Sequence, residues 1–404
     1  MDRTRVAEHN AKLTGTKKTG APGRSIRWLS DEDVLVKKSI LLNGLKYGLG
    51  LAVMAYLVWA NRAGLGALWR KHVLEGEPIN GLALSLAAGI GLASILLTFV
   101  RWYILVRAQG LPFTLVNALR LGLVGYFFSN FLPSSIGGDI IKAAFIAREQ
   151  DRRTVAVATV AIDRLVGLWG LFWLVALSGG AFWALGMVPS IAEGILKTII
   201  LVAMGLALAT LGAWFLLGLL PPFRAQRFAG RLEGIPRVGH ALAELWRALW
   251  MYRCQGRSIA LAVVLSVIGH VGFVLTYYFA GRTLFPADQI PPLVAHFLLI
   301  PIGMTFQAGF PAPGGLGGAE LCYGWLYSLI NPHFDQNGFF MALVKRMIDW
   351  GWGLAGYLVY LRMRPALLKA QPAGTTGEPE VGDEEPLPPG PEGFEARPQF
   401  ISEQ

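Results

Sequence analysis

The sequence predicts an all-α membrane protein with several membrane-spanning helices, and three observations carry this prediction. Of the 404 residues, 54% are hydrophobic and only 15% are charged, whereas an average soluble protein is about 25% charged. The mean hydropathy is +0.48. Several apolar stretches reach the roughly 20 residues that a helix needs to cross a bilayer. So little polar surface excludes a cytosolic enzyme, a disordered regulator and a secreted disulfide scaffold.

The positive charge of the chain indicates its orientation in the membrane. A net charge of +10 on a soluble protein would suggest a nucleic-acid partner. On so apolar a chain it indicates loops that face anionic lipid headgroups, so no nucleic-acid partner is predicted. Residues 221–257 carry seven arginines against two glutamates, whereas 179–192 contain no lysine or arginine. The positive-inside rule therefore places the first segment in the cytoplasm and the second outside.

The two ends of the chain are predicted to be cytoplasmic. Residues 1–38 form a basic arm with nine Lys/Arg and five Asp/Glu and without the apolar core of a signal peptide. Its last part, 25–38, is expected to form a short interfacial helix. Residues 39–364 are the predicted membrane domain. Residues 365–404 hold eight prolines and eight acidic residues, which is typical of a disordered tail.

Within the membrane domain, two stretches are apolar but interrupted by proline and glycine, namely 112–147 and 292–330. The charges of the flanking loops place both ends of each stretch on one side of the membrane. We therefore expect six full spans plus two re-entrant hairpins, the first entering from the cytoplasm and the second from outside. If hairpin arms reach the far side instead, the count rises to eight or ten. The predicted full spans are 39–60, 81–100, 154–178, 195–220, 258–280 and 337–361.

The two interrupted stretches resemble each other when they are shifted by 180 residues. The repeat halves, about 112–178 and 292–361, would enter the membrane from opposite sides, which is the inverted repeat of many secondary transporters. Backbone N–H groups freed at such turns form a cradle for anions. Two ordinary kinked spans with packing glycines are the alternative. The predicted turn residues are Pro133, Gly137 and Gly138 in the first half and Pro311, Pro313, Gly317 and Gly318 in the second.

Eight ionisable residues fall at membrane depth, where each costs several kcal/mol unless it has a partner or a function. The i,i+3 spacing of Asp139 and Lys142 and the i,i+4 spacing of Lys345 and Asp349 predict ion pairs. Lys46 and Arg101, in contrast, are expected to snorkel toward an interface. The eight residues are Asp139, Lys142, Asp163, Arg164, Glu320, Lys345, Arg346 and Asp349.

Two of these residues are predicted to bind a lipid phosphate. Arg164 and Arg346 carry planar guanidinium groups suited to phosphate oxygens, with help from the N–H groups of the glycine pairs. Asp139 and Glu320 would orient these arginines or bind a cationic headgroup. The alternative is a purely structural role in locking the hairpins. No metal-ligand spacing, phosphate-binding loop or dinucleotide fingerprint occurs, so no metal, cofactor or coupling ATPase is predicted.

Three motifs carry a resemblance to a known family: Asn130 to Asp139, Asp163 to Gly167, and Pro313 to Glu320. Over about 40–362 the sequence resembles the lysylphosphatidylglycerol synthase transmembrane, or flippase-like, family. In larger members this domain flips an aminoacylated phospholipid, which a separate C-terminal domain makes from charged tRNA. Only the acidic tail follows Arg364 here, so the resemblance implies a transporter-like role without lysyl-transferase activity.

The resemblance and the buried charges together predict a lipid translocase in a bacterial-type inner membrane. Its substrate would be a phospholipid or a polyprenyl-phosphate-linked lipid that moves between leaflets. Two alternatives stay open. One is a membrane-embedded transferase acting on a lipid carrier, with Asp139 as its acid or base. The other is a non-catalytic scaffold for a lipid- or glycan-modifying enzyme.

Overall fold

The computed structural model is helical, and the part of the chain that it describes contains no strand. The chain divides into two units, Met1–Leu361 and Arg362–Gln404. The contacts between helices described here lie within the first unit. Pro133, residues 1–24 of the predicted arm and 370–404 of the predicted tail fall outside the described residues. The structure describes residues 25–132, 137–150, 152–187, 193–236, 239–253 and 255–369.

Five helices are long and apolar enough to cross a bilayer, which confirms the predicted polytopic all-α class. The sixth predicted span lies in α14, which is equally long but carries three charged residues in its apolar stretch. The expected separate interfacial helix over 25–38 is wrong, because α2 continues unbroken through this segment. The long helices are α2 (Ser25–Ala60), α4 (Gly81–Ala108), α7 (Arg153–Ala184), α8 (Glu193–Leu219), α11 (Gly256–Leu284) and α14 (Asp335–Lys369).

Both interrupted stretches form pairs of short helices that pack against each other. At 1.5 Å per residue none of these helices exceeds roughly 26 Å, less than the ~30 Å core of a bilayer. In each pair the second helix begins at the predicted glycine pair. The first pair is α5 (Leu115–Phe131) and α6 (Gly137–Glu149); the second is α12 (Leu293–Gly309) and α13 (Gly318–Ser328), joined through the 3₁₀ turn η4 (Pro313–Gly315).

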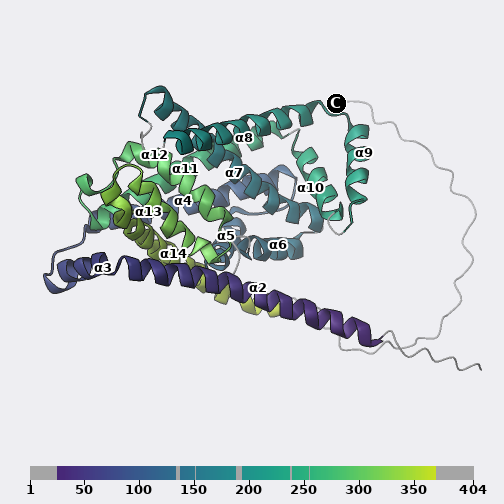
Figure 1. Cartoon of the computed structure of the whole chain (residues 1–404). Coiled ribbons are helices and arrows are strands. Elements are labelled where there is room, and N and C mark those ends of the chain that lie inside the picture. The colour runs from purple at the N-terminus through teal and green to yellow at the C-terminus, as the bar shows by residue number, and fades with distance from the viewer. Residues whose placement is uncertain are drawn as a thin grey trace, which may run out of the picture. The chain divides into compact units, whose positions relative to one another are not determined.

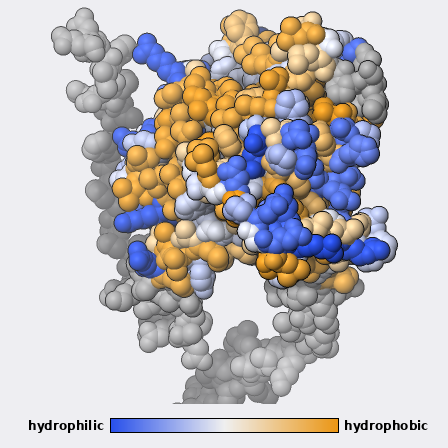
Figure 2. Space-filling model, turned by 90° about the vertical axis from the view of Figure 1, so that its left-hand side faces the viewer, coloured by the Kyte–Doolittle hydropathy of each residue, from blue (hydrophilic) through white to orange (hydrophobic). Residues whose placement is uncertain are grey.

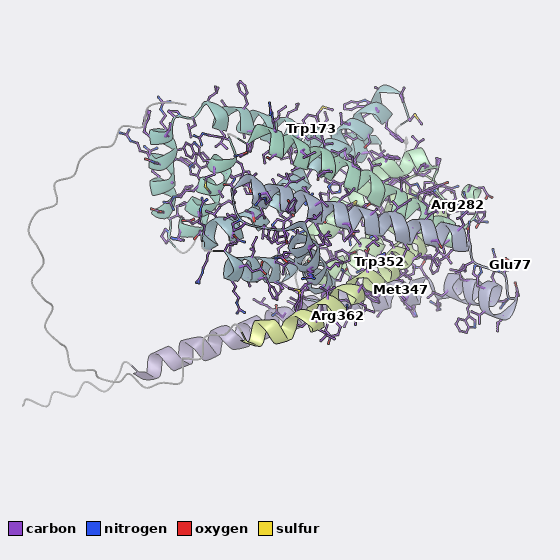
Figure 3. The ribbon with its side chains drawn as sticks, turned by 180° about the vertical axis from the view of Figure 1, so that it is seen from behind. Glu77, Trp173, Arg282, Met347, Trp352 and Arg362 are labelled. Carbon is purple, nitrogen blue, oxygen red and sulfur yellow. The ribbon has the colours of Figure 1, made fainter. Side chains whose placement is uncertain are left out.

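The bundle is built around α4 and α11, which pack side by side along much of their length (Figure 1). Small residues permit this close approach, since Gly91 faces Thr276 and Gly272 faces Ser94. The indole N–H of Trp352 in α14 also donates to the Ala88 carbonyl of α4 at 3.1 Å, and Figure 3 shows the position of Trp352 on α14. These contacts hold α4, α11 and α14 together.

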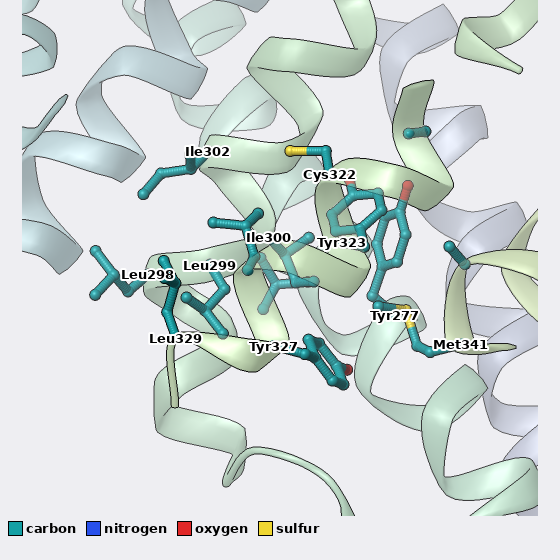
Figure 4. Packing of buried hydrophobic residues seen from close by; sticks show 14 of the residues in the cluster. Tyr277, Leu298, Leu299, Ile300, Ile302, Cys322, Tyr323, Tyr327, Leu329 and Met341 are labelled. Carbon is teal, nitrogen blue, oxygen red and sulfur yellow. The ribbon is translucent and has the colours of Figure 1, made fainter. Parts of the chain in front are cut away.

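A large buried cluster joins the second helix pair to the bundle (Figure 4). Tyr277 of α11 lies against Tyr323 of α13, with ring centroids 4.7 Å apart. The Tyr327 hydroxyl, also on α13, lies 2.7 Å from Nε2 of His296 on α12. Hydroxyl groups in an apolar core need such partners, so the polar atoms fix the register of α12 against α13.

Apolar side chains cover wide parts of the surface (Figure 2). On α8 the exposed residues include Leu201, Leu208, Phe215 and Leu216, and α2 likewise exposes Leu45 among others. A soluble monomer rarely exposes apolar patches larger than a few hundred Å². The described surface is therefore typical of helices that face lipid.

The basic segment 221–257 is not irregular, because it folds into two amphipathic helices that pack together. Arg247 donates to Glu244 at 2.7 Å and also bonds to Glu233. The bond to Glu233 raises the pKa of the Arg247 guanidinium above its ordinary value. The two helices are α9 (Pro222–Glu233) and α10 (Gly239–Tyr252); the remaining short elements are α3 (Arg62–Trp69), η1 (Arg70–Leu74), η3 (Ala287–Gln289) and η5 (Pro332–Phe334).

Candidate functional site

A cavity of about 330 Å³ lies among seven helices, near the middle of α7, α11 and α14. Ligand pockets in proteins have volumes of roughly 300–1,000 Å³, so this one is at the small end. Its lining is unusual for a protein whose outer surface is apolar. The charged side chains that line it are Arg101, Lys142, Arg164 and Lys345, against Asp139, Asp163 and Asp349.

Arg101 of α4 is part of this cavity, so the expectation that it snorkels to an interface is wrong. The helix continues to Ala108, about 10 Å beyond Arg101. The side chain is buried, with Nε 2.8 Å from Asp163 Oδ1 and Nη1 3.0 Å from Ser266 Oγ. An ion pair with a carboxylate on α7 removes the need to reach water. The sequence held a signal for this, because the apolar run continues past Arg101 to Val106.

Lys142 of α6 lies between two carboxylates of the same cluster. Its Nζ is 3.7 Å from Asp139 Oδ1 and 3.9 Å from Asp163 Oδ2. The face of the Trp102 ring lies 4.6 Å from the ammonium group, which is a favourable cation–π distance. The predicted pairing of Asp139 with Lys142 is therefore present, but its distance exceeds that of a hydrogen bond.

Arg164 of α7 pairs with Asp139, the acid that follows the first glycine pair. Nε of Arg164 lies 3.0 Å from Asp139 Oδ2, and the two side chains are 42% and 21% exposed. Both line the cavity. The guanidinium group can therefore meet a ligand without moving far from its carboxylate.

The second half contains the equivalent ion pair, but there it is buried. Arg346 of α14 forms an ion pair with Glu320 of α13, and the side chains are only 8% and 0% exposed. Nη1 of Arg346 also donates to the Gly314 carbonyl at 3.3 Å. The other oxygen of Glu320 accepts from the Gly317 N–H at 2.8 Å. Neither Arg346 nor Glu320 lines the cavity.

Lys345 and Asp349 form the predicted i,i+4 ion pair on the cavity wall. Nζ of Lys345 lies 2.7 Å and 2.5 Å from the two oxygens of Asp349. The Tyr126 hydroxyl of α5 donates to the same carboxylate at 2.7 Å. The contact links the first helix pair to α14, and sequence reasoning did not identify Tyr126 because its partner is 223 residues away.

The predicted turn residues of the second half form a tight backbone turn. Gly314 and Gly317 have φ values of 53° and 79°, in the left-handed region that glycine adopts without strain. Pro313 begins η4, and Pro311 lies in the bend before it. Of this turn, Gly314 reaches the cavity. The turn thus brings Gly314, whose carbonyl accepts a hydrogen bond from Arg346, to the wall of the cavity.

The four glycines of the two pairs are packing residues in the described structure. Gly138 at the start of α6 lies directly against the Gly125 carbonyl of α5. Gly318 lies in the same way against the Phe310 ring. None of Gly137, Gly138, Gly317 and Gly318 lines the cavity, so their predicted contact with a phosphate stays a prediction.

The fold and the charged cavity define a polytopic helical membrane protein with a polar site inside the bundle. Residues 47–354 match the model of the lysylphosphatidylglycerol synthase TM region. The chain belongs to this family, which confirms the resemblance drawn from the motifs and ties the protein to lipid metabolism. No curated protein and no solved structure matches the chain.

Proposed function

We propose that this protein is a lipid translocase that moves a phosphate-bearing lipid between leaflets. The observation that carries this proposal is the charge-lined cavity near the middle of α7, α11 and α14. Ionisable groups inside a membrane protein are costly, and they commonly mark a substrate pathway. A cavity with cations along its wall offers the polar surface that a lipid headgroup needs on its way across.

The two short helix pairs support the same proposal. Both pairs contribute side chains or backbone to the same cavity. Its lining includes Tyr126 and Lys142 from the first pair and Gln307 and Gly314 from the second. Discontinuous helices that meet at mid-membrane are typical of transporters built from inverted repeats. We propose that α5–α6 and α12–α13 are re-entrant hairpins of such a repeat, and that rocking of one half against the other opens the cavity to each side.

Within this proposal the two arginines have different roles. Arg164 lines the cavity and is partly exposed, so it contacts the lipid phosphate. Arg346 is held by Glu320 and by the Gly314 carbonyl, so it fixes the second turn against α14. The observed geometry favours Arg164 as the residue to test first.

The experiment is a translocation assay on purified protein in liposomes that contain a fluorescent phospholipid. Chemical quenching of the outer leaflet reports how fast inner-leaflet lipid appears outside. Wild-type protein should raise this rate, and Arg164→Ala should lower it about tenfold or more, since a charge-assisted hydrogen bond is lost. Arg148→Ala is the matched control, because Arg148 is exposed at the end of α6 and lies outside the cavity lining.

Two results would refute the proposal. One is a rate in protein-containing liposomes equal to that in empty ones. The other is an Arg164→Ala rate equal to that of wild type. A transferase would instead convert a radiolabelled donor and lipid carrier into product without translocation, and the same purified protein can be assayed for that reaction.

A further inference from the structure

The ammonium group of Lys142 is held differently from the other cations of the cavity. Its side chain is 9% exposed, and its nearest carboxylate oxygens are 3.7 Å and 3.9 Å away. An ammonium group has three hydrogen-bond donors, and no acceptor among the described residues lies within bonding distance of them. Lys345 of α14, in contrast, has both oxygens of Asp349 within 2.7 Å.

The charges that line the cavity do not balance. Four basic side chains face three carboxylates among the described lining residues, which leaves one positive charge. Arg101, Arg164 and Lys345 each have a carboxylate at 3.0 Å or less, namely Asp163, Asp139 and Asp349 respectively. The excess therefore falls on Lys142. A buried charge without hydrogen-bonded partners is unfavourable. An anion that binds next to the Lys142 ammonium group would therefore be stabilised.

We propose that Lys142 binds the phosphodiester of a singly charged anionic lipid headgroup. This inference rests on the proposed translocase function and names its substrate class. One excess positive charge matches one phosphodiester, whereas a pyrophosphate-linked carrier brings more charge than the cavity neutralises. The volume of about 330 Å³ accommodates a small headgroup and not a large glycan. Lys142 thus selects the headgroup charge, and Arg164 is the adjacent phosphate contact.

The test is a binding titration of the purified full-length protein in neutral detergent. The probes are dihexanoyl phosphatidylglycerol, which carries one negative charge, the zwitterionic dihexanoyl phosphatidylcholine, and inorganic phosphate. Isothermal titration calorimetry should give a dissociation constant for the anionic lipid at least about tenfold lower than for the other two probes. Lys142→Gln should remove this preference, because it removes the excess charge and the free donors. Lys142→Arg should keep it.

Lys197→Gln is the matched control. Lys197 also lies over a tryptophan ring, 5.2 Å from the centre of Trp183, but it is on α8 and outside the cavity lining. This variant should bind the anionic lipid as wild type does. Thermal unfolding of each variant in the same detergent verifies that it is folded. If Lys142→Gln does not fold, the preference of wild type for the anionic over the zwitterionic lipid still tests the inference.

The inference is overturned if Lys142→Gln binds the anionic lipid as tightly as wild type, or if wild type binds both lipids equally. It is also overturned if inorganic phosphate binds as tightly as the anionic lipid, since the ligand is then a free phosphate. Failure of the proposed function gives another result. Selective, Lys142-dependent binding without any translocation would refute the translocase and leave the binding site standing.

Discussion

The two halves of the molecule use the same pair of residue types in opposite ways. In each half, an acid just after the glycine pair forms an ion pair with an arginine on the following long helix. Asp139 and Arg164 are 21% and 42% exposed and line the cavity. Glu320 and Arg346 are 0% and 8% exposed and lie behind its wall.

The difference shows that one motif can serve two purposes, to fix a turn to a neighbouring helix and to place a charged group in a cavity. Glu320 is satisfied twice, by Arg346 and by the Gly317 N–H, so the second turn is fixed to α14. Asp139 instead shares its oxygens between Arg164 and the more distant Lys142. The first half therefore places Arg164 and Lys142 on the wall of the cavity, whereas the second half holds Arg346 and Glu320 outside the cavity lining.

The largest expected effect comes from breaking the buried pair. Glu320→Gln leaves the buried guanidinium of Arg346 without its carboxylate, and such a change typically costs about 3–5 kcal/mol. Titration with a denaturing detergent in mixed micelles measures the free energy of unfolding. The double variant Glu320→Gln/Arg346→Met should recover much of the loss, because the uncompensated charge is removed. If the single variant costs less than about 1 kcal/mol, the second half is not locked as the contacts indicate.

A smaller effect is expected where the backbones of the first helix pair touch. A methyl group on Gly138 would collide with the Gly125 carbonyl of α5, and overpacking of this kind costs about 1–3 kcal/mol. Gly138→Ala should therefore lower the thermal unfolding midpoint, measured from tryptophan fluorescence.

Gly351→Ala is the control for this change. Gly351 lies within α14 and has open space where a methyl group would be, so alanine should be neutral or slightly stabilising. Equal midpoints for Gly138→Ala and wild type would show that α5 and α6 are loosely packed. The first half would then differ from the second both in the exposure of its ion pair and in the packing of its helix backbones.

Much of this comparison could be predicted from the sequence. Hydropathy located the long helices, and proline and glycine located the breaks, because both signals are local. The i,i+4 pair of Lys345 and Asp349 and the i,i+3 pair of Asp139 and Lys142 depend only on helical geometry, and both are present. For Asp139 and Glu320 the sequence left two roles open, orientation of the arginines or binding of a cationic headgroup, and the structure shows the ion pairs with Arg164 and Arg346.

The rest depends on contacts between distant parts of the chain. Arg101 and its partner Asp163 are 62 residues apart, and Tyr126 is 223 residues from Asp349. A count of apolar residues ended the second span at Arg101, although the helix continues to Ala108. Which of two equivalent ion pairs lines a cavity is decided by packing against other helices, and this left Arg164 and Arg346 indistinguishable by sequence.

The smallest effect on stability, and the sharpest test of the comparison, is expected for Asp139→Asn. Partly exposed ion pairs contribute about 0.2–1 kcal/mol, so the free energy of unfolding should change little. Ligand binding should change in the opposite sense from Lys142→Gln. Loss of one carboxylate raises the positive excess of the cavity, and dihexanoyl phosphatidylglycerol should bind about threefold to tenfold more tightly in calorimetry. If Asp139→Asn instead destabilises the protein as much as Glu320→Gln, both halves are locks. If it weakens anion binding, Asp139 positions Arg164, and orientation outweighs charge in the first half.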